Sequence, residues 1–246
     1  MNTFSLTKGL VLGVVISFGV PEVQAEKIVF DEKVSPSTES TESQVSPKPQ
    51  IKKKRRRVPK RLRGTCDPLS AVDKSQFIFR ALVPEQTGLT SRSQPKLYWY
   101  ISEPVDTDFL LTVKPVANAK KRRRVRALVD DMELSFAVDK GIHALSLAEY
   151  GVKLREGVEY EWTLSLVCDV YNLSLNRTVG GGIKYISPAP TLANRIQQTS
   201  QSKLPYLYAK NNLWYDAVDL LATQNLNRVM ADLLKQVNLD EVARGL

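Results

Sequence analysis

The residue types that usually carry out catalysis or bind metals are scarce in this chain. Its 246 residues include one histidine, His143, and two cysteines, Cys66 and Cys168. Structural zinc sites and iron–sulfur clusters usually take four Cys or His ligands, so this inventory excludes them. Any Ser-His-Asp or Cys-His catalytic arrangement would have to use His143. Because His143 shares one face of an expected strand, 142–147, with two leucines, it is better interpreted as a structural histidine.

Two other groups of residues could do chemistry, and both have simpler structural interpretations. Asp130, Asp131 and Glu133 are carboxylates of the kind that glycoside hydrolases pair. They adjoin an arginine run, which favours a charge-balanced turn and strand edge. The three glycines at 180–182 lack the following helix and the Lys-Ser/Thr step of a phosphate-binding loop, and they indicate a flexible strand start or a bulge. The sequence therefore predicts no catalytic residue, no metal and no cofactor, and a protein that is not an enzyme.

The N-terminus has the organisation of a secretory signal peptide. Lys8 precedes an apolar run at 9–20 that is too short to span a bilayer. Compact residues then occupy positions −3 and −1 of a cleavage site before Glu26. Residues 1–25 are therefore predicted to be a signal peptide, and the mature protein is expected in the periplasm or outside the cell. A retained anchor helix is the alternative.

Export changes the meaning of the two cysteines. An oxidising compartment favours a disulfide between Cys66 and Cys168, the only pair in the chain. That bridge would close a loop of about a hundred residues, for which the chain-entropy model gives a stabilisation of at most about 4.7 kcal/mol. Two free buried thiols are the alternative.

Most of the positive charge lies outside the expected folded region. The formal net charge is +9, and residues 26–64 combine many basic residues with Ser, Thr and Pro and show no apolar periodicity. Such a composition predicts a disordered basic tail. The residues that could bind a polyanion are Lys52, Lys53, Lys54, Arg55, Arg56 and Arg57 in this tail and Lys121, Arg122, Arg123 and Arg124 in a later loop.

The basic residues leave two interpretations open. In an exported protein they could bind an acidic polysaccharide, a lipopolysaccharide, an anionic lipid or extracellular nucleic acid, since clustered positive charge attracts anionic polymers. Alternatively, they keep a linker and a loop tip soluble and bind nothing.

The folded region begins with a two-residue apolar period and ends with a helical one. The clearest alternation runs through Tyr160, Trp162 and Leu164, between polar neighbours. Strands with one apolar face, separated by Pro, Gly and Asp turns, predict an antiparallel β-sandwich over residues 65–188. The apolar spacing then changes to 3.6 residues, which predicts a C-terminal helical hairpin over residues 189–246, packed on the sandwich.

A short motif refines this expectation. The spacing of Gly157 and Tyr160 before Trp162 looks like the E–F corner of fibronectin type III and immunoglobulin-like domains, where a tyrosine hydroxyl binds nearby backbone. The predicted fold class is therefore α+β, with an immunoglobulin/fibronectin III-like antiparallel sandwich followed by the hairpin. Tyr98 and Tyr100 point away from the expected core face, where they either underlie the helices or form a surface pair that could stack on sugar.

An ordered set of motifs runs through the same region. It comprises Gly64-Thr65-Cys66, Ala81-Leu82-Val83-Pro84-Glu85, Leu97-Tyr98-Trp99-Tyr100, Tyr160-x-Trp162 with Cys168-Asp169, and Trp214-Tyr215-Asp216-Ala217. Over about residues 64–246 the chain resembles the cyanobacterial domain of unknown function numbered 928. This resemblance implies an exported protein and supports the fold outline, but it implies no particular reaction. The basic runs are not part of the motif set.

The sequence thus predicts an exported, disulfide-stapled, non-catalytic binding or assembly module of the cell envelope, with an envelope protein as its partner. The alternative function is a polyanion-binding protein that uses the basic tail and loop. A hydrolase of unrecognised type is the third hypothesis.

Overall fold

A computed structural model describes residues 26–33, 77–116, 126–169 and 171–246. In this part of the chain, strands come first and helices follow, so the protein has a mixed α+β fold. The strands are β1 (Phe79–Ala81), β2 (Gly88–Thr90), β3 (Lys96–Ile101), β4 (Val105–Pro115), β5 (Val129–Val138), β6 (Gly141–Ser146), β7 (Glu159–Leu166) and β8 (Arg177–Tyr185). The helices are α1 (Pro190–Gln198), α2 (Leu204–Lys210), α3 (Trp214–Thr223), α4 (Asn227–Lys235) and α5 (Asp240–Ala243).

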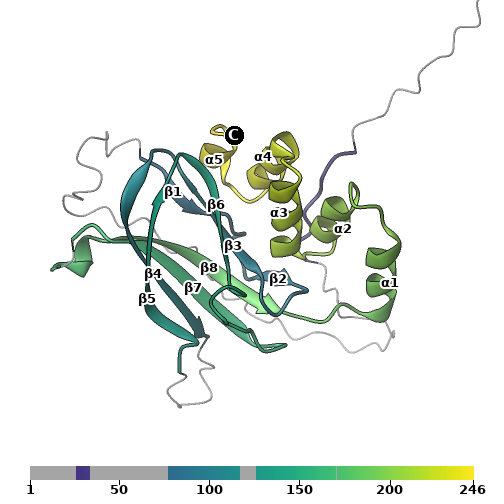
Figure 1. Cartoon of the computed structure of the whole chain (residues 1–246). Coiled ribbons are helices and arrows are strands. Elements are labelled where there is room, and N and C mark those ends of the chain that lie inside the picture. Colours follow the sequence, from purple (N-terminus) through teal and green to yellow (C-terminus); the bar gives the residue numbers. More distant parts are fainter. Residues whose placement is uncertain (1–25, 34–76, 117–125, 170) are drawn as a thin grey trace, which may run out of the picture.

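The strands form two sheets that share a core. One sheet has the order β1-β3-β6 and the other the order β2-β8-β7-β4-β5. Phe109 of β4 contacts both strands opposite it, with its ring 6.2 Å from that of Phe79 in β1 and 6.4 Å from that of Trp99 in β3. The helices lie together at one side of the two sheets (Figure 1).

The expected alternation and corner are present in the five-stranded sheet. Along β7, Tyr160, Trp162 and Leu164 are buried and their neighbours are half-buried. The Tyr160 hydroxyl accepts a hydrogen bond from the Arg155 backbone N–H at 3.2 Å, and Gly157 between them has φ +71°. This contact ties the turn before β7 to the strand, as the tyrosine-corner spacing predicts.

The expectation of purely antiparallel sheets is wrong at one pair. Strand β2 pairs with β8 in parallel, with Gly88 opposite Ile183 and Thr90 opposite Tyr185. Parallel neighbours need a long connection, and here most of the strand region lies between the two strands in sequence. Local periodicity carries no information about such a distant pairing, so the sheet is mixed.

The glycine run is also different from the expected flexible strand start. Gly180, Gly181 and Gly182 lie within β8 and pair continuously with β7. A Cβ atom at Gly180 would stand 2.1 Å from the Trp162 carbonyl oxygen, and one at Gly181 would stand 2.8 Å from Val83. The run is therefore required by close packing of β8 against its neighbours, which only glycine permits.

The C-terminal region contains five short helices where a two-helix hairpin was expected. Helices α2, α3 and α4 are each followed by an asparagine with positive φ and then by a leucine whose N–H bonds back to the carbonyl five residues earlier. These pairs are Asn212-Leu213, Asn225-Leu226 and Asn238-Leu239. This is the Schellman arrangement, which ends a helix and fixes the direction of the next. Among the described helices, none has the length and apolar character needed to cross a membrane.

Candidate functional site

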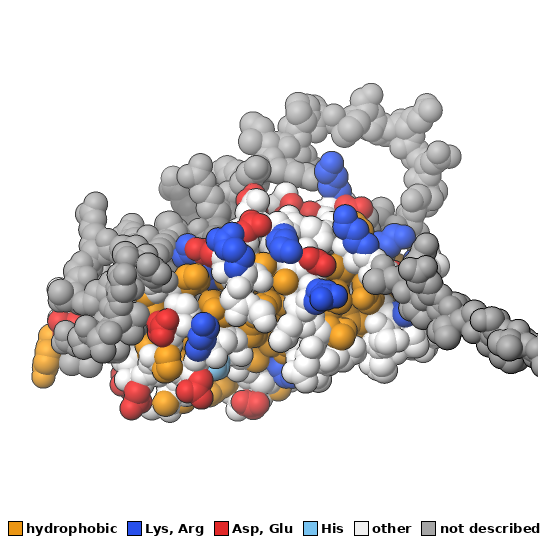
Figure 2. All heavy atoms as spheres, turned by 90° about the horizontal axis from the view of Figure 1, so that it is seen from above, with side chains coloured by type: hydrophobic (Ala, Val, Ile, Leu, Met, Phe, Trp, Pro, Cys, Tyr) orange, Lys and Arg blue, Asp and Glu red, His pale blue; other side chains and the backbone are white. Residues whose placement is uncertain are grey.

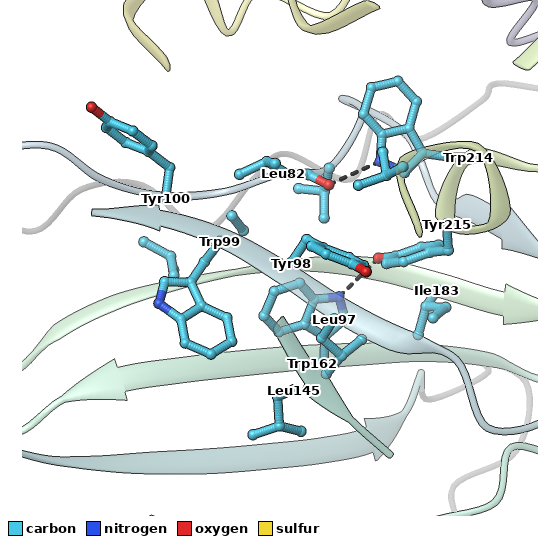
Figure 3. Close-up of a cluster of buried hydrophobic side chains, with 14 of the residues drawn as sticks. Leu82, Leu97, Tyr98, Trp99, Tyr100, Leu145, Trp162, Ile183, Trp214 and Tyr215 are labelled. Carbon is cyan, nitrogen blue, oxygen red and sulfur yellow. Dashed lines mark hydrogen bonds between the residues drawn. The ribbon is translucent and has the colours of Figure 1, made fainter. Parts of the chain in front are cut away.

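The helices are attached to the sheets by aromatic side chains at the start of α3. The Trp214 indole N–H donates to the Leu82 carbonyl at 2.9 Å. The Trp162 indole N–H donates to the Tyr215 hydroxyl at 2.8 Å, and that hydroxyl donates to the Gly182 carbonyl at 3.0 Å (Figure 3). Burial raises the pKa of Tyr215, so the hydroxyl stays protonated and can serve as this donor.

Two buried carboxylates on the same helix extend this attachment. Asp216 accepts hydrogen bonds from the backbone N–H and the hydroxyl of Ser91, both at 2.8 Å. Asp219 accepts a hydrogen bond from the Tyr98 hydroxyl at 2.7 Å and forms ion pairs with Lys96, at 3.1 Å, and Arg92. Since these partners lie on and just before β3, the two acids hold α3 against that strand.

The two acids have opposite pKa shifts. Burial raises the pKa of Asp216 despite the hydrogen bonds that it accepts. Burial acts in the same direction at Asp219, but hydrogen bonds from Tyr98 and Lys96 and the charge of Arg92 outweigh it and lower the pKa. Opposite shifts are typical of acid–base pairs in enzymes. Here the oxygens of both carboxylates bind protein donors, which makes them structural groups.

The sequence left two possible locations for Tyr98 and Tyr100, and in the structure both lie beneath the helices. Tyr98 and Tyr100 are 4% and 2% exposed. Tyr98 binds Asp219 of α3, and the Tyr100 hydroxyl packs so closely on the C-terminal turn that a Cβ at Gly245 would be 2.3 Å from it. The alternative of a surface aromatic pair for sugar stacking is therefore wrong.

Residues 26–33, here called the arm, lie in a groove of the helical region. The sequence assigned them to a disordered tail, and the structure describes these eight residues as an extended segment. Ile28 is 2% exposed and Val29 is 52% exposed, and the three residues that follow Val29 are half-buried. Two apolar side chains are enough to dock the arm because the groove also binds its backbone.

The side-chain amide of Gln236, just after α4, contacts the arm backbone at two points. It donates to the Ile28 carbonyl at 3.1 Å and accepts from the Phe30 N–H at 2.9 Å. On the opposite side, the Ala209 carbonyl at the end of α2 accepts from the Asp31 N–H at 3.3 Å. The groove therefore binds an extended backbone from both sides, largely independently of the side chains that the backbone carries.

The arm continues the same contacts towards the sheets. Asn212 donates from its amide to the Glu32 carbonyl at 3.2 Å, and the Glu32 carboxylate accepts from the Gln86 N–H at 3.2 Å. The Phe30 ring lies edge-on to Trp214, with centroids 4.8 Å apart. The groove is thus adjacent to the residue that anchors α3 on the sheets.

Hollows flank the arm on its sides. One of about 440 Å³ lies towards α1 and α2, one of about 520 Å³ towards α4, and one of about 650 Å³ between the arm, residues 85–86 and the end of α4. The first is lined by four basic residues, Lys27, Arg195, Lys203 and Lys210, and two acids, Glu26 and Asp31. On the face seen in Figure 2, basic side chains alternate with acidic and hydrophobic ones.

Most of the predicted binding residues are outside the described part of the chain. Lys52–Arg57 of the tail, Lys121–Arg124 of the loop and Cys66 all fall there. Cys168 is described: it is 4% exposed, two residues after β7, and its backbone N–H donates to the Asn176 side chain at 3.0 Å. The predicted polyanion-binding role of the two basic runs and the predicted disulfide therefore stay predictions.

The candidate catalytic residues have structural contacts. The His143 ring lies 5.7 Å from that of Trp99, stacked on it, and its Nε2 is 2.6 Å from the Asp139 carbonyl oxygen. Asp131 contacts the Thr112 hydroxyl at 2.8 Å across the β4–β5 pair. Among the described residues there is no cluster of three or more His, Cys, Asp or Glu side chains placed to hold a metal ion.

The groove was not predicted from the sequence. The only signal of the arm is the apolar stretch Ile28-Val29-Phe30, which is three residues long. Gln236 and Asn212 carried no signal, because uncharged polar residues near helix ends are common.

Comparison with known proteins gives a family and no activity. A family model described as Domain of Unknown Function (DUF928) matches residues 59–245. No curated protein matches the chain. The matched region includes the groove residues Ala209, Asn212, Trp214 and Gln236 and leaves out the arm.

Proposed function

We propose that the chain, which belongs to the DUF928 family, is a non-catalytic binding or assembly module that docks an extended peptide in its helical groove. The observation that carries this proposal is the double contact of the Gln236 amide with the carbonyl of Ile28 and the N–H of Phe30. One amide that binds both a carbonyl and an N–H of an extended chain is suited to peptides in general. The adjoining apolar contacts would then select among sequences.

The groove is proposed to take a segment of a cell-envelope protein. Residues 1–25 would act as the signal peptide that exports the chain to the periplasm or beyond. The two packed sheets and the Tyr160 corner support an immunoglobulin/fibronectin III-like class for the strand region. A sandwich of this kind would serve as the rigid support of the groove, through the Trp214 and Tyr215 contacts.

A matched pair of glutamine variants tests the proposed function. Gln236→Leu removes the amide that binds the arm backbone, whereas Gln224→Leu removes an exposed amide that binds only the Gln201 carbonyl. Affinity capture from envelope extract with quantitative mass spectrometry is expected to lose its partner with Gln236→Leu and to keep it with Gln224→Leu. Identical captured proteins for both variants would contradict binding through the groove.

The Cys66–Cys168 bridge is part of this proposal. Its support is that Cys168 is buried and that there is no free thiol among the cysteines that the structure describes. Loss of a native disulfide from a secreted domain typically costs about 2–5 kcal/mol, so Cys168→Ser is expected to lower the melting temperature measurably. Two reactive thiols in denatured, unreduced protein would refute the bridge.

A second candidate function is binding of an anionic polymer. It is favoured by the hollow that Lys27, Arg195, Lys203 and Lys210 line, since none of these residues forms an ion pair with another described residue. Binding through such charges weakens steeply as salt concentration rises. Heparin and duplex DNA are therefore suitable probes, with neutral replacements of Lys52–Arg57 and of Arg122–Arg124 as variants. Binding that does not depend on salt or on these residues would exclude this function.

A further inference from the structure

The groove binds some positions of the arm by their side chains and leaves others exposed. The Ile28 side chain is buried, and the Phe30 ring is edge-on to Trp214. The Glu32 carboxylate accepts a hydrogen bond from the Gln86 N–H. Val29, between the first two positions, is 52% exposed, and the carboxylate of Asp31, between the last two, accepts a hydrogen bond from the Lys33 N–H of the arm itself. The positions that matter are therefore separated by one residue each.

From this pattern we infer that the groove recognises partner peptides with the order apolar–x–aromatic–x–acidic, and that the arm is a tethered competitor for them. The inference rests on the proposed function and specifies its ligand. The contacts with Gln236, Ala209 and Asn212 involve backbone atoms of the arm, so a different peptide with these three side chains can make all of them.

The arm is bound in a way that permits exchange. In Figure 1 the arm runs between α2 on one side and α3 and α4 on the other. The three hollows beside it leave its flanks unsealed, so its release does not require the sheets or helices to separate. A longer or bulkier peptide can use these hollows for contacts that the arm itself does not make.

The covalent connection sets the strength of the competition. Residues 34–76 join the arm to β1 and its preceding residues, so the arm docks as an intramolecular event. Covalent attachment to the same chain gives the arm an effective local concentration, against which a free peptide must compete. A partner succeeds only if it binds better than the arm or is presented at a high local concentration.

The test uses a fluorescein-labelled peptide of residues 26–33 as the probe and fluorescence anisotropy as the readout. It is titrated with the full chain and with a full-length Ile28→Ser/Phe30→Ser variant, in which the arm has lost its buried isoleucine and its half-buried phenylalanine side chain. Hydrogen exchange confirms that the variant's arm is released, and near-ultraviolet circular dichroism confirms that its body is folded. We expect the variant to bind the probe at least about tenfold more tightly than the unaltered chain, because the tethered competitor is gone.

Peptide and protein controls identify the site. A probe with Val29→Ser is expected to bind as well as the parent, whereas a probe with Ile28→Ser and Phe30→Ser does not bind and one with Glu32→Gln binds more weakly. Adding Gln236→Leu to the arm-released variant is expected to abolish binding.

The outcomes separate the inference from the proposed function. Equal binding of the probe by both proteins would overturn the competitor role and leave the peptide-binding groove intact. Absence of binding to the folded, arm-released variant at concentrations up to about 1 mM would overturn both. Equal binding of the parent probe and the doubly substituted probe would overturn the sequence pattern.

Discussion

The helical region contacts the sheets on one side and the arm on the other. The two contacts differ in whether side chains or backbone atoms are bound. On one side, α3 binds the sheets through side chains that are fully buried: Trp214, Tyr215 and Asp216. On the other side, the end of α2 and Gln236 bind the arm mainly through its backbone, and the Val29 side chain between these contacts is exposed.

This difference separates a permanent contact from an exchangeable one. A buried polar group without its partner costs about 1–3 kcal/mol, so the α3–sheet contact forms as a unit with the fold. The backbone of the arm can form hydrogen bonds with water when it leaves a surface groove. Its release therefore costs less free energy than separation of α3 from the sheets. The helices thus use one face for stability and another for the recognition that we propose.

The largest expected effect comes from the residue that belongs to both contacts. Trp214→Ala removes a fully buried indole, its bond to Leu82 and the contact with Phe30. Loss of such a side chain from a core typically costs about 3–5 kcal/mol. We expect urea denaturation to show this loss and hydrogen exchange to show release of the arm in the folded protein. If Trp214→Ala released the arm without lowering the free energy of unfolding, Trp214 would not belong to the stabilising contact.

A smaller effect is expected from Tyr215→Phe, which deletes one hydroxyl. The Trp162 indole N–H and the Gly182 carbonyl both lose their partner inside the protein. At about 1–3 kcal/mol for a buried unsatisfied group, the free energy of unfolding should fall by about 2 kcal/mol. Tyr150→Phe, at an exposed tyrosine, is the matched control and should change it by less than about 0.5 kcal/mol. Equal effects would show that the buried bonds do not hold α3 in place.

Removal of arm side chains should affect the stability of the body least among the contact variants. Ile28→Ser removes most of the buried apolar side chain of the arm, which is worth about 1.5–3 kcal/mol for docking. Because the arm leaves without unfolding the body, the melting temperature should hardly change. Faster exchange of the Phe30 and Asp31 amides is the expected observation. A fall in melting temperature as large as that of Trp214→Ala would show that the arm is an integral part of the fold.

The smallest effects concern pH and should oppose each other at the two carboxylates. The folded pKa of Asp219 is lowered, so its stabilisation is present at neutral pH and is lost only as pH falls below the usual Asp value near 4. The folded pKa of Asp216 is raised, so its contribution to stability increases as pH falls from neutral through that pKa. The free energy of unfolding should be measured by denaturation from pH 8 to pH 3. In Asp219→Asn its decrease at acid pH should disappear, and in Asp216→Asn its increase with falling pH should disappear. Curves that kept both features would contradict these shifts.

Local periodicity and spacing predicted part of the fold. The alternation through Tyr160 and Trp162 indicated the strand that became β7, and the distance from Gly157 to Tyr160 indicated the corner. Both depend on neighbours in sequence. The parallel pairing of β2 with β8 and the close approach that requires Gly180 depend on distant residues, and no local pattern encodes them.

The candidate site was harder to predict, for related reasons. Asp216 and Asp219 are charged residues on a helix, which are exposed in most proteins, and only the neighbouring Ser91 and Tyr98 explain their burial. The arm has three apolar residues within a charged, Ser- and Pro-rich stretch, too few to alter its composition. The helix ends at Asn225 and Asn238 were not predicted, because asparagine can adopt positive φ but does so only in context.

The asparagine–leucine turns make the length of the C-terminal helices as important as their composition. Asn212, Asn225 and Asn238 follow one another at equal intervals along the chain. One residue inserted into α4 would rotate everything beyond it by about 100° around the helix axis, because a turn takes about 3.6 residues. Gln236 would then point away from the arm although every groove residue was retained. Natural variation in this region should therefore be rich in substitutions on exposed faces and poor in insertions and deletions, and recognition should depend on a conserved count of residues.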